Sequence, residues 1–336
     1  MRLFTAGRLL AAGGVLLVVF IALWVMPSSE YIFLPDRAHP VGPLVTVQGG
    51  HNPTRGGVYF VDIIVRKATI LEKLFGGLHN GADLFPASEI DPPGSNSAQR
   101  NRIDVEDMHR SQQIAAAVAL KALGRKVIER PIGVLIADVA PGLPADGKLL
   151  PDDIVTAVNG KRVTTYTQLS TIVRAGKIGG VVRFTIKRAG KILLETMRTV
   201  AGTNPRRPIV GIGLDSSPAV DIQLPIHVSI DAGNVGGPSA GLAFALEVME
   251  KLGRDVVHGH KIAATGEIFP DGSIGPIGGI KQKVIGAREA GVDAFLVPAG
   301  DNAREARKDA HGLRIIAVQN FQQALHALAT LPPVTH

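Results

Sequence analysis

A serine and a lysine in the C-terminal third of the chain have the types and surroundings that acyl-transfer hydrolysis needs. Ser239 lies in the glycine-rich segment Gly236-Gly237-Pro238-Ser239-Ala240-Gly241, and Lys283 follows 44 positions later. A serine hydroxyl becomes a nucleophile when a neighbouring base takes its proton, and a neutral lysine amine is one such base. The two residues therefore predict a Ser-Lys dyad.

The segments around both residues predict helix starts. A strand over 225–230 leads into a loop, and a helix is expected from Ala240 to Leu252, directly after Ser239. Lys283 falls in the first turn of a helix expected over 280–290. The unpaired N–H groups and positive partial charge of a helix start favour an oxyanion, and they lower the pKa of a lysine.

Three further residues are candidates for supporting this chemistry. The loop that carries Gly237 and Pro238 is expected to direct backbone amides, up to that of Ser239, at an oxyanion. Thr265, in the segment Ala263-Ala264-Thr265-Gly266-Glu267, is expected to hydrogen-bond the lysine amine and orient it. Lys281 is in the same turn as Lys283 and is expected to be solvated or structural.

The composition narrows the class of protein. The chain has 336 residues, 46% of them hydrophobic, which is enough for two domains with packed cores. It contains no cysteine, so disulfides and thiol chemistry are excluded. The net charge of +7 is scattered and aromatic residues make up only 4%, so we expect no nucleic-acid partner.

The N-terminus has the pattern of a membrane anchor. Residues 9–26 form an apolar run without a charge, preceded by Arg2 and Arg8. At ~1.5 Å per residue such a helix approaches the ~30 Å of a bilayer core. The arginines place the N-terminus in the cytoplasm and the rest of the chain outside. A cleaved signal peptide is the alternative, but the run is long and Val25-Met26-Pro27-Ser28 is a poor cleavage site.

The region between the predicted anchor and residue 127 predicts a β-hairpin and helices. Two segments rich in strand formers, 44–47 and 58–65, flank turn residues and predict the hairpin. A short helix is expected over 70–76. Asp104 is expected to cap a longer amphipathic helix over 105–123, which Gly124 ends.

A middle segment has the order of motifs of a small β-rich module. Pro131-Ile132-Gly133-Val134-Leu135-Ile136 opens a strand, a Pro/Gly-rich turn follows, and Asp152-Asp153-Ile154-Val155 leads to Asn159-Gly160. This order resembles a PDZ domain over residues 128–200. The resemblance implies peptide binding by strand addition, at Ile132, Gly133, Val134 and Leu135.

The catalytic segments resemble the proteolytic domain of the Lon protease family over about residues 205–330. The Gly-Pro-Ser-Ala-Gly block, the Thr-Gly-Glu block, Pro276-x-Gly-Gly-x-x-x-Lys283 and Leu296-Val297-Pro298 occur in the family's order. The resemblance implies that Ser239 is the nucleophile and Lys283 the general base. With the predicted anchor and the PDZ-like segment, the chain is similar to membrane-anchored, PDZ-containing, Lon-like proteases of bacteria.

These inferences predict an α+β protein: a Lon-type proteolytic domain with an embedded PDZ domain, behind an N-terminal transmembrane helix. The expected parts are residues 1–27 for the cytoplasmic N-terminus and anchor, 28–127 for the hairpin and helical region, 128–200 for the PDZ domain and 205–332 for the proteolytic domain. The resemblance implies an ATP-independent serine endopeptidase of the bacterial cell membrane, single-pass with its N-terminus in the cytoplasm. It would cleave proteins or peptides outside that membrane.

No cofactor and no metal are expected, and the PDZ module is expected to select or gate substrate. A homo-oligomer is possible in this family but is not indicated by the sequence itself. Two alternatives stay open: a membrane-bound PDZ binding protein with an inactive protease domain, and an esterase of the α/β-hydrolase type, because residues 237–241 also satisfy G-x-S-x-G.

Overall fold

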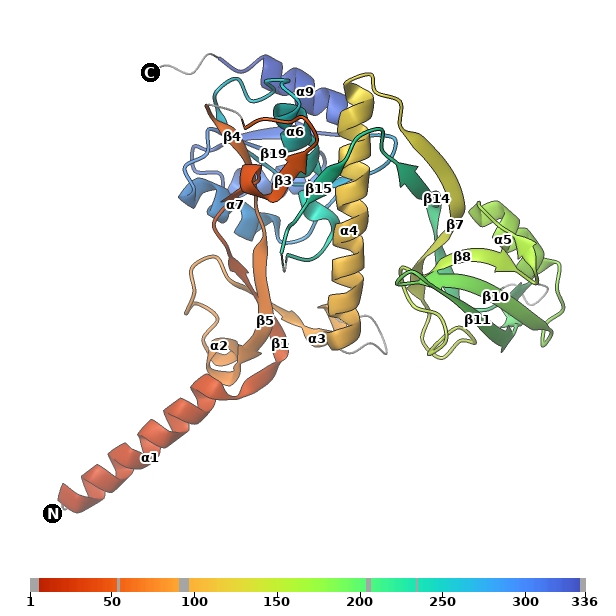
Figure 1. Cartoon of the computed structure of the whole chain (residues 1–336). Coiled ribbons are helices and arrows are strands. Elements are labelled where there is room, and N and C mark those ends of the chain that lie inside the picture. The colour runs from red at the N-terminus through yellow and green to blue at the C-terminus, as the bar shows by residue number, and fades with distance from the viewer. Residues whose placement is uncertain (1–5, 53–54, 91–96, 204–206, 234, 333–336) are drawn as a thin grey trace.

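The computed structural model describes residues 6–52, 55–90, 97–203, 207–233 and 235–332, and shows an α+β fold (Figure 1). In chain order the helices are α1 (Ala6–Val25), η1 (Gly42–Leu44), α2 (Ile70–Leu74), α3 (Ala87–Ile90), α4 (Ser97–Ala122), α5 (Tyr166–Arg174), η2 (Pro238–Ala240), α6 (Gly241–Lys251), α7 (Ile280–Glu289), α8 (Asp301–Lys308) and α9 (Phe321–Ala329), where η marks a 3-10 helix.

A five-stranded sheet forms the centre of the proteolytic part. Its strands lie in the order β2 (His39–Pro40), β4 (Gly57–Phe60), β16 (Lys261–Ala264), β19 (Ala294–Pro298) and β20 (Arg314–Val318). The last four run parallel, and β2 is antiparallel to β4. Strands buried on both faces read as continuous apolar runs, as Phe295-Leu296-Val297 does here.

The two faces of this sheet are covered by different helices. Ile262, Leu296 and the strand residues that point to the same face of the sheet pack against α4, α6 and α9 in the larger core. Ala263 and Phe295 point the opposite way and pack against α7 and α8. Because successive strand residues alternate in direction, one sheet holds α6, which follows Ser239, and α7, which carries Lys283, on opposite sides.

The predicted hairpin over residues 44–65 is wrong. The first segment is β3 (Val45–Val47), which pairs with β15 (Val228–Ile230). The second segment divides at Val61-Asp62, so that β4 enters the central sheet and β5 (Ile63–Thr69) pairs with β1 (Pro27–Pro35). The apolar pattern identified strand formers, but their partners are distant in sequence. The short helix predicted over 70–76 is confirmed as α2.

Among the described residues, the remaining small sheets are one of three strands and two of two strands. The strand β6 (Asp83–Pro86) pairs with β1 and makes a three-stranded sheet in the order β5-β1-β6. Two further pairs are β12 (Val200–Ala201) with β13 (Pro208–Ile209), and β17 (Glu267–Ile268) with β18 (Ile274–Gly275).

An embedded β-rich module has its own core. Its sheet has the order β11 (Lys191–Arg198), β10 (Val181–Arg188), β8 (Ile154–Val158), β7 (Ile128–Val139) and β14 (Ile212–Gln223), and β9 (Lys161–Arg162) pairs with β8. The core runs from Val134 to Val210, with Leu214 at its margin. The module therefore takes in β14, which lies beyond residue 200.

The long helix α4 stands between this module and the central sheet (Figure 1). It begins at Ser97, so Asp104 lies inside the helix and does not cap it as predicted. The predicted C-terminal end is confirmed, because Gly124 has a left-handed φ of 73° and donates to the carbonyl of Lys121.

The helix α1 extends away from the folded body (Figure 1). Within the described residues, no helix is both long enough and apolar enough to cross a membrane. The predicted transmembrane helix is therefore not supported by the structure.

Candidate active site

Ser239 lies in η2, immediately before α6, in a loop that two hydrogen bonds and a glycine turn hold in place. Ser111 of α4 donates its hydroxyl to the carbonyl oxygen of Pro238 at 3.0 Å. The Gly266 N–H donates to the carbonyl oxygen of Ser239 at 2.7 Å. Gly237 has a φ of 80°, the left-handed conformation that favours glycine. The nucleophile candidate is thus tied both to α4 and to the chain that follows β16.

Lys283 is the fourth residue of α7 and points into the protein towards Ser239. Its Nζ donates to Ser239 Oγ at 2.7 Å, and its side chain is almost completely buried. The helix begins after Gly279, which has a left-handed φ of 66° and where a Cβ would lie 2.7 Å from Ile63 Cδ1. This turn sets the direction in which the first turn of α7 leaves the sheet.

Thr265 connects the two residues. It is fully buried, its Oγ1 donates to the carbonyl oxygen of Ser239 at 3.1 Å, and it accepts from Lys283 Nζ at 3.2 Å. A hydroxyl has one proton, so donation to the carbonyl leaves the oxygen to accept from lysine. The structure therefore brings together the three residues that the sequence pointed to for nucleophile, base and orientation.

Burial decides the electrostatics of the pair. Desolvation lowers the pKa of Lys283 from 10.5 to about 8, against a smaller opposing effect of the Asp62 carboxylate. Burial, and after it the neighbouring Asp36 carboxylate, raise the pKa of Asp62. A lysine with a pKa near 8 is neutral in a substantial fraction of molecules at neutral to mildly alkaline pH. A neutral amine is the form that can take a proton from serine.

The predicted oxyanion donors are only partly available. The Gly237 N–H donates to the carbonyl oxygen of Asp104 at 2.9 Å, because the loop is tied to α4. Pro238 has no N–H at all. The prediction that Gly237 contributes its amide is therefore wrong for this conformation, and the amide of Ser239 itself stays the candidate donor.

Lys281 has a structural partner, as expected. Its Nζ lies 2.7 Å from Asp83 Oδ1, and Gln282 Nε2 donates to the other oxygen of the same carboxylate at 2.7 Å. The two contacts fasten α7 to β6. The position of Lys283 inside the protein is thus supported by the two residues that precede it.

The sequence did not reveal the residues of α4 that hold the site. Ser111 and Asp104 contact the serine loop from a helix more than 120 positions away. On the same helix, Arg110 donates to Asp107 and to Asp152 of the embedded module, both at 2.8 Å. Burial and Asp152 raise the pKa of Asp107 to about 7. The sequence pattern showed only an amphipathic helix, because these partners are distant.

A cavity of about 310 Å³ lies where α4, the embedded module and the chain after Thr265 meet. Its lining includes Arg110 and His109 of α4, Ile132 and Leu135 of β7, and Glu267. Burial raises the pKa of Glu267. The space between the two parts of the protein is therefore lined by both charged and apolar groups.

The predicted peptide-binding strand of the PDZ-like module is wrong. Val134 of β7 pairs with Val155 of β8 on one side and with Pro218 of β14 on the other. Gly133 is paired with Ala219, and a Cβ there would lie 2.6 Å from the carbonyl oxygen of Val155. Ile132 and Leu135 belong to the same strand. Both edges of β7 are thus occupied, and strand addition needs a free edge.

The sheet ends at β11 on one side and at β14 on the other. Among the described residues no strand pairs with the outer edge of β14, and α5 contacts this strand near its beginning. Ile172 of α5 and Ile212 and Leu214 of β14 are partly buried at the margin of the module's core. This edge, and not β7, has the geometry that a peptide strand requires.

The serine is not part of a nucleophile elbow. The strand before it, β15, pairs with β3 outside the central sheet. The side chain that contacts Ser239 Oγ is a lysine, and no histidine is among its hydrogen-bond partners in the described part of the chain. An esterase of the α/β-hydrolase type requires a strand of the central sheet that leads directly into the serine, and a histidine as its base.

One group of side chains in the described part of the chain has the spacing of a metal site. Asp36, His39 and Asp62 each offer one ligand atom, and these atoms lie within 4.8 Å of one another. His39 Nε2 is 3.5 Å from Asp36 Oδ2 and 3.8 Å from Asp62 Oδ1. All three side chains are partly exposed.

Comparison with known families gives two matches. The model of the Lon protease (S16) C-terminal proteolytic domain matches residues 151–330, and the PDZ domain model matches residues 101–187. The matches overlap over 151–187, where the structure shows strands and the helix of the embedded module.

Curated relatives agree with the first match. Lon protease 2 of Bacillus subtilis (strain 168) is 27% identical over 268 residues, 78% of this chain and 45% of that protein. Lon protease of Rickettsia typhi (strain ATCC VR-144 / Wilmington) is 31% identical over 182 residues, 53% of this chain and 22% of that protein. The chain thus spans less than half the length of these relatives.

Among solved structures, the PDZ domain of the SdrC-like protein from Listeria monocytogenes is 22% identical. The match covers 25% of this chain and 90% of the Listeria chain, with a TM-score of 0.25.

Proposed function

Because this chain belongs to the family of Lon protease (S16) proteolytic domains, we propose that it is a serine endopeptidase with Ser239 as nucleophile and Lys283 as general base. One observation carries the proposal: the buried Nζ of Lys283 lies 2.7 Å from Ser239 Oγ. A nucleophile and base within hydrogen-bonding distance, with the base oriented by a third group, are the requirement for covalent catalysis.

The proposed reaction has two steps. Neutral Lys283 takes the hydroxyl proton of Ser239 as Oγ attacks the substrate carbonyl, and the resulting ammonium then gives this proton to the leaving amine. Water, deprotonated by the same lysine, attacks the acyl-enzyme and releases the second product with Ser239 restored. The buried Thr265 hydroxyl keeps the lysine directed at Oγ throughout. The Ser239 amide and the start of α6 favour the oxyanion.

We further propose that cleavage needs no ATP. The segment of this chain that most resembles a phosphate-binding loop is Gly142–Leu149. Such loops need a serine or threonine hydroxyl after the lysine to hold magnesium. Here Leu149 follows Lys148 and is buried in the core of the embedded module.

We propose that the PDZ module binds an extended peptide along the outer edge of β14, with α5 on the other side of the peptide. This replaces the predicted site on β7. The apolar side chains of Ile172, Ile212 and Leu214 would line the groove. Because β14 runs back towards the proteolytic part, a peptide bound along its edge would alter the position of the chain that leads from β14 to Ser239. This supports a role of the module in selecting or gating substrate.

The location outside a bacterial cytoplasmic membrane and a homo-oligomeric state stay predictions. The first rests on the charge pattern around residues 9–26, the second on the family alone. Labelling of a single introduced cysteine in intact cells with a membrane-impermeant reagent would test the location, since the natural chain has no cysteine.

The decisive experiment is cleavage of unfolded casein by the full chain without ATP, beside Ser239→Ala, Lys283→Ala and Lys281→Ala. Lys281 is the matched control because it occupies the same turn but faces Asp83. We expect the first two variants to lose at least about a thousandfold in rate. The control should lose far less, because Gln282 still holds α7 to Asp83. Full activity in Lys283→Ala would exclude the proposed base. An inactive parent chain, with folding intact, would favour the binding-protein alternative.

A further inference from the structure

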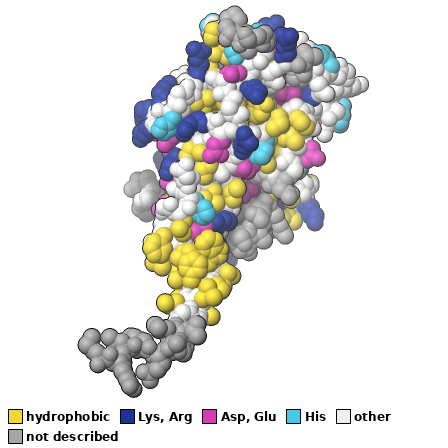
Figure 2. Space-filling view, turned by 90° about the vertical axis from the view of Figure 1, so that its left-hand side faces the viewer, with side chains coloured by type: hydrophobic (Ala, Val, Ile, Leu, Met, Phe, Trp, Pro, Cys, Tyr) yellow, Lys and Arg dark blue, Asp and Glu magenta, His cyan; other side chains and the backbone are white. Residues whose placement is uncertain are grey.

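Three large apolar side chains are exposed together where α2 ends. Leu74 is 62% exposed, Phe75 59% and Leu78 48%, and we call these residues the α2 patch. They lie at the base of α1, where Trp24, Val25 and Met26 are also more than half exposed. Figure 2 shows apolar side chains gathered where α1 joins the folded body. Contiguous exposed apolar surface of this kind usually marks an interaction site.

The end of α1 and the α2 patch form one continuous surface. The N–H of Ile70, the first residue of α2, donates to the carbonyl oxygen of Met26 at 3.0 Å. A cavity of about 280 Å³ between them is lined by Trp24, Leu71 and Leu78. Whatever contacts the exposed face of Trp24 is therefore also within reach of the α2 patch.

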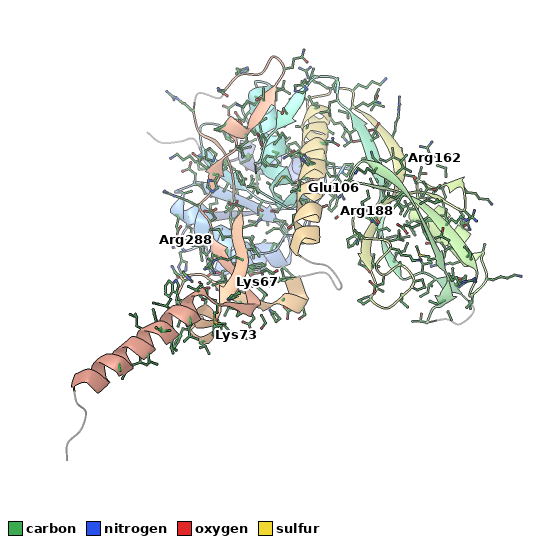
Figure 3. The ribbon with its side chains drawn as sticks, turned by 60° about the horizontal axis from the view of Figure 1, so that its bottom comes forward. Lys67, Lys73, Glu106, Arg162, Arg188 and Arg288 are labelled. Atoms are coloured by element: carbon green, nitrogen blue, oxygen red, sulfur yellow. The ribbon has the colours of Figure 1, made fainter. Side chains whose placement is uncertain are left out.

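Lysines flank this surface. Lys67 is exposed on β5, and Lys73 is on α2; both lie near the end of α1 (Figure 3). Lys73 Nζ is 2.9 Å from Glu30 and so is partly neutralised, whereas Lys67 is not in an ion pair in the described part of the chain. Aliphatic and aromatic side chains next to a tryptophan and lysines are the composition found at the boundary between lipid and water.

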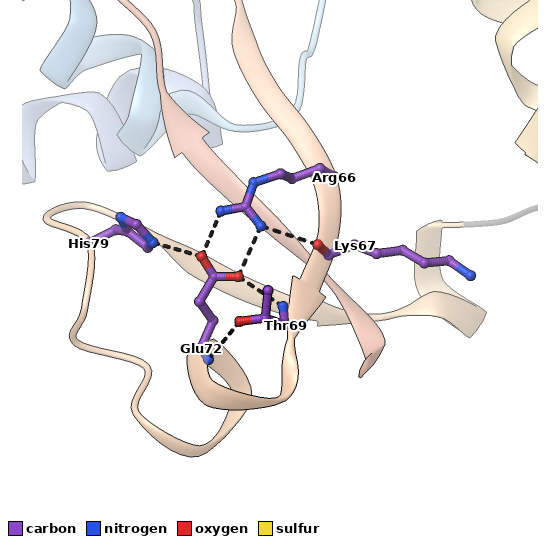
Figure 4. A network of polar contacts seen from close by, with 5 residues as sticks. All are labelled: Arg66, Lys67, Thr69, Glu72 and His79. Atoms are coloured by element: carbon purple, nitrogen blue, oxygen red, sulfur yellow. Dashed lines mark hydrogen bonds and ion pairs between the residues drawn. The ribbon is translucent and has the colours of Figure 1, made fainter. Parts of the chain in front are cut away.

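A network of polar contacts around the buried Glu72 holds the α2 patch in place (Figure 4). Glu72 accepts two hydrogen bonds from Arg66, at 2.6 and 2.9 Å, and contacts His79 Nε2 at 2.7 Å. It also forms a reciprocal capping box with Thr69 at the start of α2. These contacts hold the pKa of Glu72 well below its ordinary value. Leu74 and Phe75 are therefore presented at the end of a capped helix, and Leu78 precedes His79, which contacts Glu72.

We propose that the α2 patch inserts into the surface of a lipid bilayer, beside α1, so that this end of the protein rests on the membrane. Exposed apolar side chains, the adjoining apolar surface of α1 and lysines that match anionic headgroups occur together here. The rigid network beneath fixes one orientation of the body relative to the bilayer. The proposal concerns attachment and does not depend on the catalytic role of Ser239.

The absence of cysteine from the natural chain allows a direct test. The variant Phe75→Cys is labelled with an environment-sensitive fluorophore in the full chain. Its matched control is Ile192→Cys, because Ile192 is 76% exposed on β11 of the embedded module, away from α1. Both are mixed with phosphatidylcholine vesicles that carry a lipid-borne quencher, with or without phosphatidylglycerol. Circular dichroism melting checks that each variant is folded.

We expect the emission of the label at position 75 to shift to shorter wavelength and to be quenched, and that of the label at position 192 to stay unchanged. Lys67→Ala should weaken binding to the anionic vesicles about fivefold, the effect of one lysine near such a surface. A label at 75 that stays in water overturns the proposal, whether or not α1 holds the chain on the vesicles. Equal shifts at both positions would mean non-specific adsorption, and a concentration-dependent shift without lipid would mean that a second copy covers the patch; both also overturn it.

Discussion

Lys281 and Lys283 belong to the same turn of α7, yet their ammonium groups reach opposite environments. Lys281 Nζ lies 2.7 Å from a carboxylate oxygen of Asp83, whereas Lys283 Nζ contacts the hydroxyl oxygens of Ser239 and Thr265. The second lysine is buried and has no ion pair with any residue that the structure describes, so its charged form is penalised. A difference of two positions in one helix thus separates a structural ion pair from a candidate base.

The rate of cleavage should rise with pH through the pKa of Lys283. With that pKa near 8, kcat/KM should increase about tenfold per pH unit below pH 8 and level off above it, because only the neutral amine takes the proton. Initial rates on a fluorogenic peptide from pH 6 to pH 10 measure this. A rate that falls over the same range would contradict a lysine base.

The same lysine should reduce stability at neutral pH. In the unfolded chain its pKa is near 10.5 and in the fold about 8, so between these values the unfolded chain binds more protons and the free energy of unfolding rises with pH. Lys283→Met removes this penalty, which is at most about 3 kcal/mol.

We therefore expect the variant to be more stable than the parent below pH 8, with the difference shrinking towards pH 10.5. Urea unfolding of both proteins at several pH values measures it, and the difference cancels contributions of other groups. A constant difference across the range would mean that Lys283 titrates alike in both states.

Thr265 should act through the orientation and pKa of the lysine. Thr265→Val keeps the shape but removes the hydroxyl, so we expect kcat to fall about 10–100-fold with little change in KM. The midpoint of the pH profile should move lower, since the ammonium loses an acceptor. Thr265→Ser retains the hydroxyl and should restore both quantities. A loss of stability with an unmoved midpoint would indicate a packing role only.

Close packing of α7 against the chain after β1 should make Gly286 irreplaceable. A Cβ at this position would overlap the carbonyl oxygen of Asp36, which is backbone and cannot move aside. We expect Gly286→Ala to lower the free energy of unfolding by about 2 kcal/mol or more, in spite of the better helix propensity of alanine. Gly278→Ala is the control, because its added Cβ would meet no described residue other than its chain neighbours within 4 Å. Thermal melting should show little change there.

The ion pair between Arg110 and Asp152 should couple the two parts of the protein. Arg110→Met leaves Asp107 and Asp152 without their shared cation and should cost about 3 kcal/mol. Asp152→Asn keeps a side chain that tolerates the left-handed φ of 67° at this position and should cost less. A double-mutant cycle by urea unfolding should give a coupling of about 1 kcal/mol or more. Additive losses would show that the contact is not energetically significant.

The sequence by itself determined the candidate dyad. Ser239, Thr265 and Lys283 each follow a local signal, a glycine-rich turn, a strand end or a helix start, and such signals depend on neighbours within a few residues. The same is true of α2 and of the end of α4 at Gly124. The family resemblance rests on these short blocks, so it can be recognised from the sequence without knowledge of the fold.

Only the tertiary structure decided which strands pair and which edges stay free. The segments 44–47 and 58–65 have the composition of strands, but β3, β4 and β5 pair with β15, β16 and β1 instead of with each other. In the same way β14 pairs with one edge of β7, and the carbonyl oxygen of Asp104 accepts a hydrogen bond from the N–H of Gly237. The residues around a strand former or a backbone N–H do not specify its hydrogen-bond partner, because hydrogen bonds between distant segments are set by how the whole chain packs.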